Sequence, residues 1–128
     1  MKLLLDTHVF IWLDSEPGNL SPTAAALLGD PDNLLLLSVA SLWEMQIKQP
    51  LGKLTLRMPL PNTVAQQVAT NSLVILPIMP AHVYGVGTLP TIHNDPFDRL
   101  LVAQALAEDA VLVTGDAALG QYPVRVLW

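Results

Sequence analysis

The chain has 128 residues, the length of one domain, so we expect a single domain over residues 1–128. It contains no cysteine, which excludes disulfides and thiolate metal sites and favours a reducing cytoplasm. No apolar stretch is long enough to cross a bilayer, so we expect no membrane association. The net charge of −5 argues mildly against a nucleic-acid partner, because most nucleic-acid binders carry a basic face.

The first half of the chain alternates short apolar runs with longer helical stretches. Ser21 followed by Pro22 is typical of a helix start, and Ser38 can cap a second long helix. Four consecutive leucines from Leu34 are typical of a strand that is buried on both faces. The predicted order is strand 2–6, helix 9–13, helix 22–28, strand 34–37 and helix 39–49.

The second half continues the alternation. Asp95 and Pro96 predict the start of a strong helix, and Gly87 and Pro90 predict a loop before it. The predicted order is a helix from Asn62 or Thr63 to about residue 70, strand 73–78, helix 80–86, loop 87–94, helix 96–108, strand 111–114 and strand 124–127. This alternation predicts an α/β fold with a mainly parallel sheet.

Composition leaves one question open. Hydrophobic residues make up 52% of the chain and charged residues only 13%. Few polar side chains are therefore available to cover the outside. Either some apolar surface is exposed and covered by a partner, or the chain has an unusually dense core.

Two aspartates follow predicted strands. Asp6 comes directly after the first strand, and Asp116 comes after the fourth strand, beyond Thr114 and Gly115. Ligands of parallel α/β sheets bind in the crevice beyond the carboxyl ends of the strands. Both carboxylates project into that crevice if the two strands are neighbours.

Two further carboxylates lie on predicted helices. Glu44 interrupts an apolar stretch and either points into a polar crevice or pairs with Lys48 on the surface. Asp98 falls at the third position of the helix capped by Asp95, where a carboxylate also favours the helix dipole. Asp6 can equally be a turn residue and Asp116 a cap, so spacing alone does not decide for a metal site.

Four segments resemble the PIN-domain family and, within it, the VapC toxins of bacterial and archaeal toxin–antitoxin pairs. They occur in order and span nearly the whole chain: Leu5-Asp6-Thr7-His8, then Ser41-Leu42-Trp43-Glu44-Met45 with Lys48 and Leu51-Gly52-Lys53-Leu54, then His93-Asn94-Asp95-Pro96-Phe97-Asp98-Arg99 with the helix after it, then Leu112-Val113-Thr114-Gly115-Asp116. The resemblance implies a three-layer α/β/α sandwich around a central, mainly parallel sheet of four to five strands.

The resemblance also implies an activity. It implies a Mg²⁺-dependent endoribonuclease, with Mn²⁺ as a possible substitute, whose metal ligands and catalytic residues are Asp6, Glu44, Asp98 and Asp116. A metal-activated water would hydrolyse RNA to leave a 5′-phosphate and a 3′-hydroxyl. The partners implied are a cognate antitoxin, bound as a helix in a groove, the RNA substrate and a second copy of the chain.

Several side chains have two interpretations each. The hydroxyls of Thr7 and Thr114 can bind substrate or a water at the metal, or satisfy backbone groups at the strand ends. Arg99 can bind RNA phosphate or pair with Asp95, which we take first as a cap. The residues His8, His82 and His93 lack zinc spacing, so we expect structural roles, although His8 can line the cleft and His93 can brace the loop before Asp95.

Aromatic residues and competing families complete the sequence interpretation. Trp12, Trp43 and Trp128 can stack on bases, but packing in a core or partner interface is the expected role.

An aspartyl phosphatase needs an aspartate where His8 stands, and a phosphorelay receiver needs a late lysine that is missing. The alternative from another class is a non-catalytic PIN-like module that binds RNA or a partner. Its decayed site would not be expected to keep all four acidic residues.

Overall fold

A computed structural model describes residues 1–128. Five parallel strands form one sheet in the order β3-β2-β1-β4-β5. Their bounds are Lys2–Leu5 for β1, Leu34–Ser38 for β2, Val74–Leu76 for β3, Val111–Val113 for β4 and Val126–Leu127 for β5. The predicted α/β class with a parallel sheet is confirmed.

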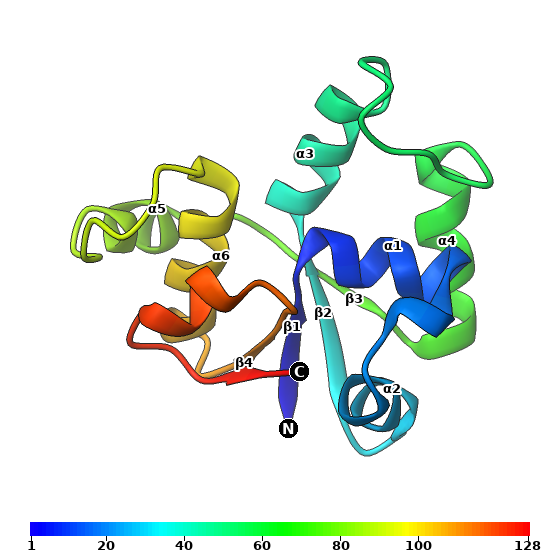
Figure 1. Ribbon diagram of the computed structural model, residues 1–128, viewed down its shortest axis with the longest axis horizontal. Coiled ribbons are helices and arrows are strands. Elements are labelled where there is room, and N and C mark those ends of the chain that lie inside the picture. The colour runs from blue at the N-terminus through cyan, green and yellow to red at the C-terminus, as the bar shows by residue number, and fades with distance from the viewer.

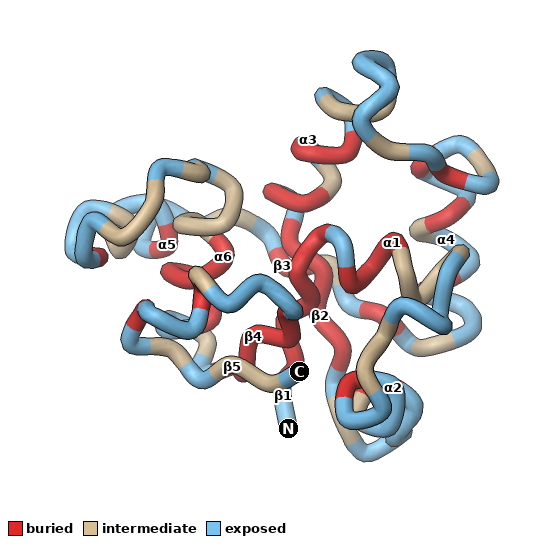
Figure 2. The backbone as a smooth tube through the Cα atoms, in the orientation of Figure 1, coloured by how far each residue is buried: buried red, intermediate tan, exposed pale blue.

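The central strand β1 is buried on both faces, which explains its run of leucines. Leu4 pairs with Leu36 of β2 and with Leu112 of β4, and all three side chains belong to one core cluster. Leu3 and Leu5 belong to the cluster on the opposite face. Alternate residues of a strand point to opposite faces, so a continuous apolar run supplies both cores. Figure 2 shows this buried centre.

Helices cover both faces of the sheet and complete a three-layer sandwich (Figure 1). Residues of α1, α2, α3 and α4 share the core cluster of one face, whereas α6 supplies the cluster of the other face and packs against α5. The helices are α1 Thr7–Ser15, α2 Pro22–Gly29, α3 Val39–Lys48, α4 Leu60–Asn71, α5 Pro80–Val86 and α6 Pro96–Ala107, with short 3-10 helices η1 Pro17–Asn19 and η2 Ala117–Gln121. None of these helices has the length and apolarity that a membrane-spanning segment requires.

Some predicted boundaries were wrong, each for a local reason. Helix α1 begins at Thr7 rather than residue 9, because Asp6 is already its N-cap. Helix α4 begins at Leu60 rather than Asn62, since Pro61 lies in the first turn, where its missing N–H has no intrahelical acceptor to serve. Strand β3 ends at Leu76, and the next residue, Pro77, has no N–H to donate to a neighbouring strand.

The strand order creates a crevice at one point of the sheet. The chain moves outward from β1 to β3 on one side and returns to β4 on the other side of β1. The Asp6 N–H donates to the Val113 carbonyl at 3.0 Å, so the ends of β1 and β4 lie side by side. Ligands bind at such a reversal in α/β sheets, which is where both aspartates were expected.

Candidate metal centre

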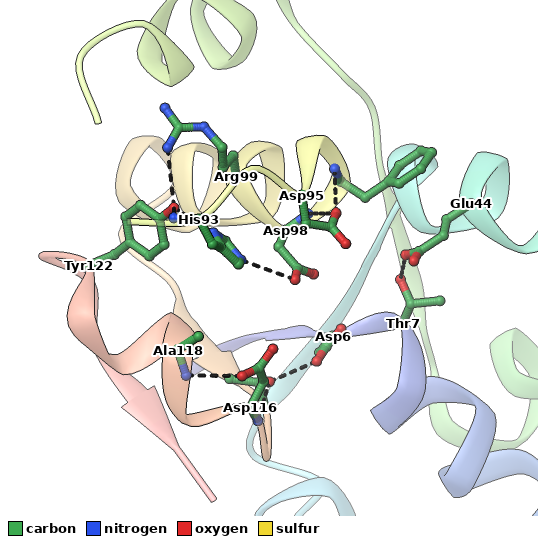
Figure 3. Close-up of polar contacts among 12 residues, drawn as sticks. Asp6, Thr7, Glu44, His93, Asp95, Asp98, Arg99, Asp116, Ala118 and Tyr122 are labelled. Carbon is green, nitrogen blue, oxygen red and sulfur yellow. Dashed lines mark hydrogen bonds and ion pairs between the residues drawn. The ribbon is translucent and has the colours of Figure 1, made fainter. Parts of the chain in front are cut away.

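An acidic cavity of about 420 Å³ opens at the carboxyl edge of the sheet. All four predicted ligands line it, and Asp95 is a fifth carboxylate there (Figure 3). The complete lining is Asp6, His8, Trp12, Glu44, Lys48, Asp95, Asp98, Gly115 and Asp116.

Four different elements deliver the predicted ligands. Asp6 ends β1, Glu44 lies on α3, Asp98 lies in the first turn of α6, and Asp116 precedes η2. Asp6 and Glu44 are buried at 7% and 3% exposure, whereas Asp116 is exposed. The carboxylates therefore line the cavity from its floor to its rim.

The hydroxyl of Thr114 holds Asp6 in place. It donates to Asp6 Oδ2 at 2.7 Å and accepts the Asp116 N–H at 3.1 Å. Thr114 itself is buried at 1% exposure. This hydroxyl joins the ends of β1 and β4, because it satisfies a backbone N–H, as one of its two interpretations predicted, and also orients Asp6. A role of Thr114 in binding substrate or water stays a prediction.

Glu44 has partners on both carboxylate oxygens. The Thr7 hydroxyl donates to Glu44 Oε1 at 2.7 Å, and its oxygen lies 2.9 Å from that of the buried Ser41 hydroxyl. Lys48, one helical turn further on, donates to Glu44 Oε2. The predicted pair of Glu44 with Lys48 is present, but it lies in the cavity and not on a solvated surface.

A chain of polar contacts leads from Asp98 away from the cavity. His93 Nε2 lies 3.3 Å from Asp98 Oδ2, and His93 Nδ1 lies 2.7 Å from the buried Tyr122 hydroxyl. Arg99 donates to the same hydroxyl at 3.2 Å, as Figure 3 shows. His93 braces the loop before α6, as predicted, and it also fixes the orientation of Asp98.

Arg99 lies outside the lining of the cavity. Besides Tyr122, its guanidinium donates to the carbonyls of Pro90 at 3.0 Å and Val86 at 3.3 Å. The alternative surface pair with Asp95 does not form in the structure. Asp95 instead accepts the N–H groups of Phe97 and Asp98, which makes it the N-cap that was predicted.

Each of the four aspartates has one oxygen fixed by the protein. Oδ2 is fixed in Asp6 and Asp98, and Oδ1 is fixed in Asp95 and Asp116. These hydrogen bonds leave the second oxygen of each free to bind another group. Each aspartate therefore offers one oriented oxygen atom to a group bound in the cavity.

Burial and mutual repulsion raise the affinity of two carboxylates for protons. Burial raises the pKa of Asp98 to about 7, and the charges of Asp6 and Asp95 add to this effect. Burial also raises the pKa of Asp6, although the hydrogen bond from Thr114 opposes the change. The hydrogen bond to Glu44 raises the pKa of Lys48. Carboxylates that cost free energy to ionise together are a signature of a site for a cation.

A sequence profile of the PIN domain matches residues 3–124. The chain belongs to the PIN-domain family. No curated protein matches it in a search of whole sequences.

Solved structures with the same fold agree with this membership. The PIN domain described here is similar to a chain of VapBC2 from Rickettsia felis bound to a DNA fragment from their promoter, with a TM-score of 0.75 and 18% identity over 99% of this chain and 98% of that chain. It is similar to a chain of VapBC-1 from nontypeable Haemophilus influenzae, with a TM-score of 0.62 and 18% identity over 99% and 97%. It is also similar to a chain of FitAcB from Neisseria gonorrhoeae, with a TM-score of 0.58 and 19% identity over 98% and 96%.

The donor set of this PIN domain fits a hard cation held partly through water. No three of the acidic or histidine side chains are close enough to bind one metal ion together. Mg²⁺ keeps several of its waters and is held by one or two carboxylates, so it does not need three protein ligands in contact. The cavity offers oxygen donors and no thiolate, which suits Mg²⁺ or Mn²⁺.

Sequence reasoning gave two residues of the cavity another role and left a third open. Lys48 was treated as a surface partner of Glu44, and Trp12 was expected in a core or partner interface. His8 was expected either to have a structural role or to line the cleft; it is exposed and lines the cavity, and its ring contacts that of Trp12 with centroids 5.9 Å apart and planes tilted by 46°. The spacing of Asp6, His8 and Trp12 could have predicted that His8 and Trp12 line the cavity. Helix α1 begins directly after Asp6, so its first turns run along the crevice.

Proposed function

We propose that this PIN domain is a Mg²⁺-dependent endoribonuclease whose catalytic residues are Asp6, Glu44, Asp98 and Asp116. The observation that carries the proposal is the convergence of five carboxylates on one open cavity at the strand-order reversal. The raised pKa of Asp6 and of Asp98 supports it, because positive charge would relieve both.

In this proposal, each residue of the cavity has its own role. One or two of Asp6, Glu44 and Asp98 would bind the ion directly, and the remaining carboxylates, with Asp116 at the rim, would bind through its waters. When bound, Mg²⁺ supplies positive charge that neutralises the phosphate and activates water for attack. Thr114, Thr7 and His93 keep the carboxylates in fixed orientations, so little reorganisation is needed when the substrate arrives. Lys48 is the one lysine or arginine in the lining and can contact a phosphate oxygen.

The direct experiment incubates the purified protein with total RNA and Mg²⁺ and maps the new ends. We expect fragments with 5′-phosphate and 3′-hydroxyl ends, lost in EDTA and in Asp6→Asn. Asp32→Asn is the matched control, since it removes a carboxylate from an exposed turn outside the cavity. Metal-independent cleavage, or cleavage retained in Asp6→Asn, would refute the proposal. RNA binding without cleavage would favour the non-catalytic module instead.

We further propose that the chain is the toxin of a toxin–antitoxin pair in the cytoplasm. The likeness to chains of VapBC and FitAcB complexes supports this role. Exposed apolar surface supports a protein partner: Trp43 is 60% exposed beside an apolar groove of about 590 Å³ between α3 and α4. Val39, Leu42, Leu60 and Val64 line that groove, which fits the apolar face of a helix.

Expression in a bacterial host tests the toxin role. We expect growth arrest with the wild-type chain, none with Asp6→Asn, and recovery when the antitoxin is produced with it. We also expect a homodimer, which light scattering on the purified protein measures. Unimpaired growth at full expression of an active nuclease would remove the toxin role and leave the nuclease proposal standing.

A further inference from the structure

Aromatic side chains form one wall of the acidic cavity, although a metal site does not require them. Trp12 is the one large apolar side chain in its lining, and His8 lies beside it. The two residues are four apart on α1, so they share a face of that helix. Their ring centroids are 5.9 Å apart, and Trp128 continues the cluster with its centroid 5.8 Å from that of Trp12.

The same sheet edge that carries the carboxylates builds this wall. Trp128 directly follows β5, whose Leu127 pairs with Val113 of β4. The Thr114 N–H donates to the Leu127 carbonyl at 3.2 Å, so Trp128 follows at the level where Thr114 holds Asp6. Gly115 permits this packing, because a Cβ there would lie 3.0 Å from the Trp128 indole.

None of the three rings is in the core. Trp128 is 37% exposed, Trp12 is half-buried and His8 is exposed. Trp12 and Trp128 therefore do not pack in the core, and the other half of the expectation, packing in a partner interface, stays a prediction. Their packing leaves aromatic surface at the mouth of a cavity that is otherwise polar, and every nucleobase has a π-face that fits such a surface.

We propose that His8 and Trp12 stack on an unpaired base next to the phosphate in the cavity and thereby position the substrate. The inference rests on the proposed nuclease function and adds the residues that bind a base. Bases in a duplex already stack on their neighbours, and only a base that is splayed out can stack on a side chain. The Trp128 ring contacts that of Trp12 and helps to hold it in place.

A nucleotide fits this wall better than an apolar protein segment. Five carboxylates line the same cavity as Trp12, and an apolar segment there would remove them from water without hydrogen bonds. A nucleotide offers a phosphate to the cation side and a ring to the aromatic side. Trp43, by contrast, faces an apolar groove with no acidic residue in its lining, which suits a protein.

The experiment compares variants on one RNA of about 12 nucleotides, supplied single-stranded or annealed to its complement. Trp12→Leu should raise KM for the single strand about fivefold or more with little change in kcat, and Trp12→Phe should restore KM. Trp43→Leu is the matched control and should keep the wild-type KM. The wild type should cut the duplex at least about tenfold more slowly than the single strand.

A second readout does not depend on cleavage. In the Asp6→Asn background, fluorescence anisotropy of the labelled single strand should show weaker binding with Trp12→Leu and with His8→Ala. His8→Ala removes an exposed ring and keeps the inference testable if Trp12→Leu fails to fold. Equal KM values for Trp12→Leu and Trp43→Leu, or equal cutting of duplex and single strand, overturn the stacking role while cleavage itself upholds the nuclease. If binding depends on Trp12 and His8 but the wild type cuts no RNA, the stacking role is supported and the proposed nuclease function is refuted.

Discussion

Replacing Asp98 with asparagine removes one negative charge from the cavity and keeps the shape of the side chain. In the metal-free protein, the ionised Asp98 is half-buried beside the charges of Asp6 and Asp95. We expect Asp98→Asn to unfold at a higher temperature than the wild type at pH 8 in EDTA, although it loses cleavage. A fold that becomes more stable when this carboxylate loses its charge would support a cavity that binds a cation.

The pKa of Asp98 sets the magnitude. A rise from 3.8 to about 7 makes the ionised form about 4 kcal/mol less favourable in the folded state at pH 8. The side chain is 15% exposed, and solvent screens part of this cost. We therefore expect asparagine to stabilise the metal-free fold by about 1–2 kcal/mol, which raises Tm by roughly 3–8 °C for a domain of this size.

The assay is thermal unfolding in EDTA across pH, followed by circular dichroism. Because folding raises the pKa of Asp98, its protonated form stabilises the wild type fully below pH 3.8, and this contribution is lost as pH rises to about 7. The Tm difference between Asp98→Asn and wild type should therefore be largest at pH 8 and shrink toward pH 4. Asp32→Asn, in an exposed turn, should show no such trend.

Two results would refute this reasoning. A Tm for Asp98→Asn at or below that of the wild type at pH 8 would mean that ionised Asp98 is not under strain. A Tm difference that stays constant from pH 4 to pH 8 would mean that asparagine acts through packing and not through charge.

Three further predictions concern the metal and the residues that hold its ligands. Mg²⁺ or Mn²⁺ at about 100 times its Kd should stabilise the wild type by about 2.7 kcal/mol in thermal unfolding, and Asp6→Asn should lose most of this gain. Lys48→Met should lower the free energy of unfolding in EDTA by about 1–2 kcal/mol in urea titrations, because it leaves the buried Glu44 without its cation, and saturating Mg²⁺ should offset much of the loss. Tyr122→Phe should weaken Mg²⁺ binding by about tenfold in calorimetry, since its hydroxyl holds His93 against Asp98.

Each of these predictions has an outcome that contradicts it. A Tm indifferent to both metals argues against any cation in the cavity. An equal loss of stability in Lys48→Met with and without Mg²⁺ would show that Lys48 and the ion do not act on the same carboxylate. Unchanged Mg²⁺ binding in Tyr122→Phe, with reduced stability alone, would limit Tyr122 to a structural role.

The sequence predicts the fold well where the signal is local. Four apolar residues from Leu34 specify a strand buried on both faces, and Ser21, Ser38 and Asp95 cap helices at the expected places. The position of Asp6 at a strand end was enough to expect it in the crevice. In each case the determining interactions lie within a few residues of one another along the chain.

The details of the site could not be predicted, because they depend on contacts between distant segments. The Tyr122 hydroxyl meets His93 and Arg99 only after η2 packs near the start of α6. The spacing of Arg99 from Asp95 on one helix suggested an ion pair, but carbonyls of another segment compete for the guanidinium. Trp128 meets Trp12, more than a hundred residues earlier in the sequence, and the pairing of β5 with β4 places it there.

Much of the negative charge of the chain lies in the acidic cavity, so the net charge is compatible with a nucleic-acid substrate. Five of the eleven acidic residues line the acidic cavity, so one or two divalent cations bound there would change the net charge from −5 to −3 or −1 and would cancel negative charge at the proposed phosphate site. Metal and RNA then favour each other, and the coupling is reciprocal: the factor by which Mg²⁺ strengthens RNA binding is the factor by which RNA strengthens Mg²⁺ binding. Under the proposed function the chain needs no basic face, because the substrate would bring the negative charge and the bound cation the positive.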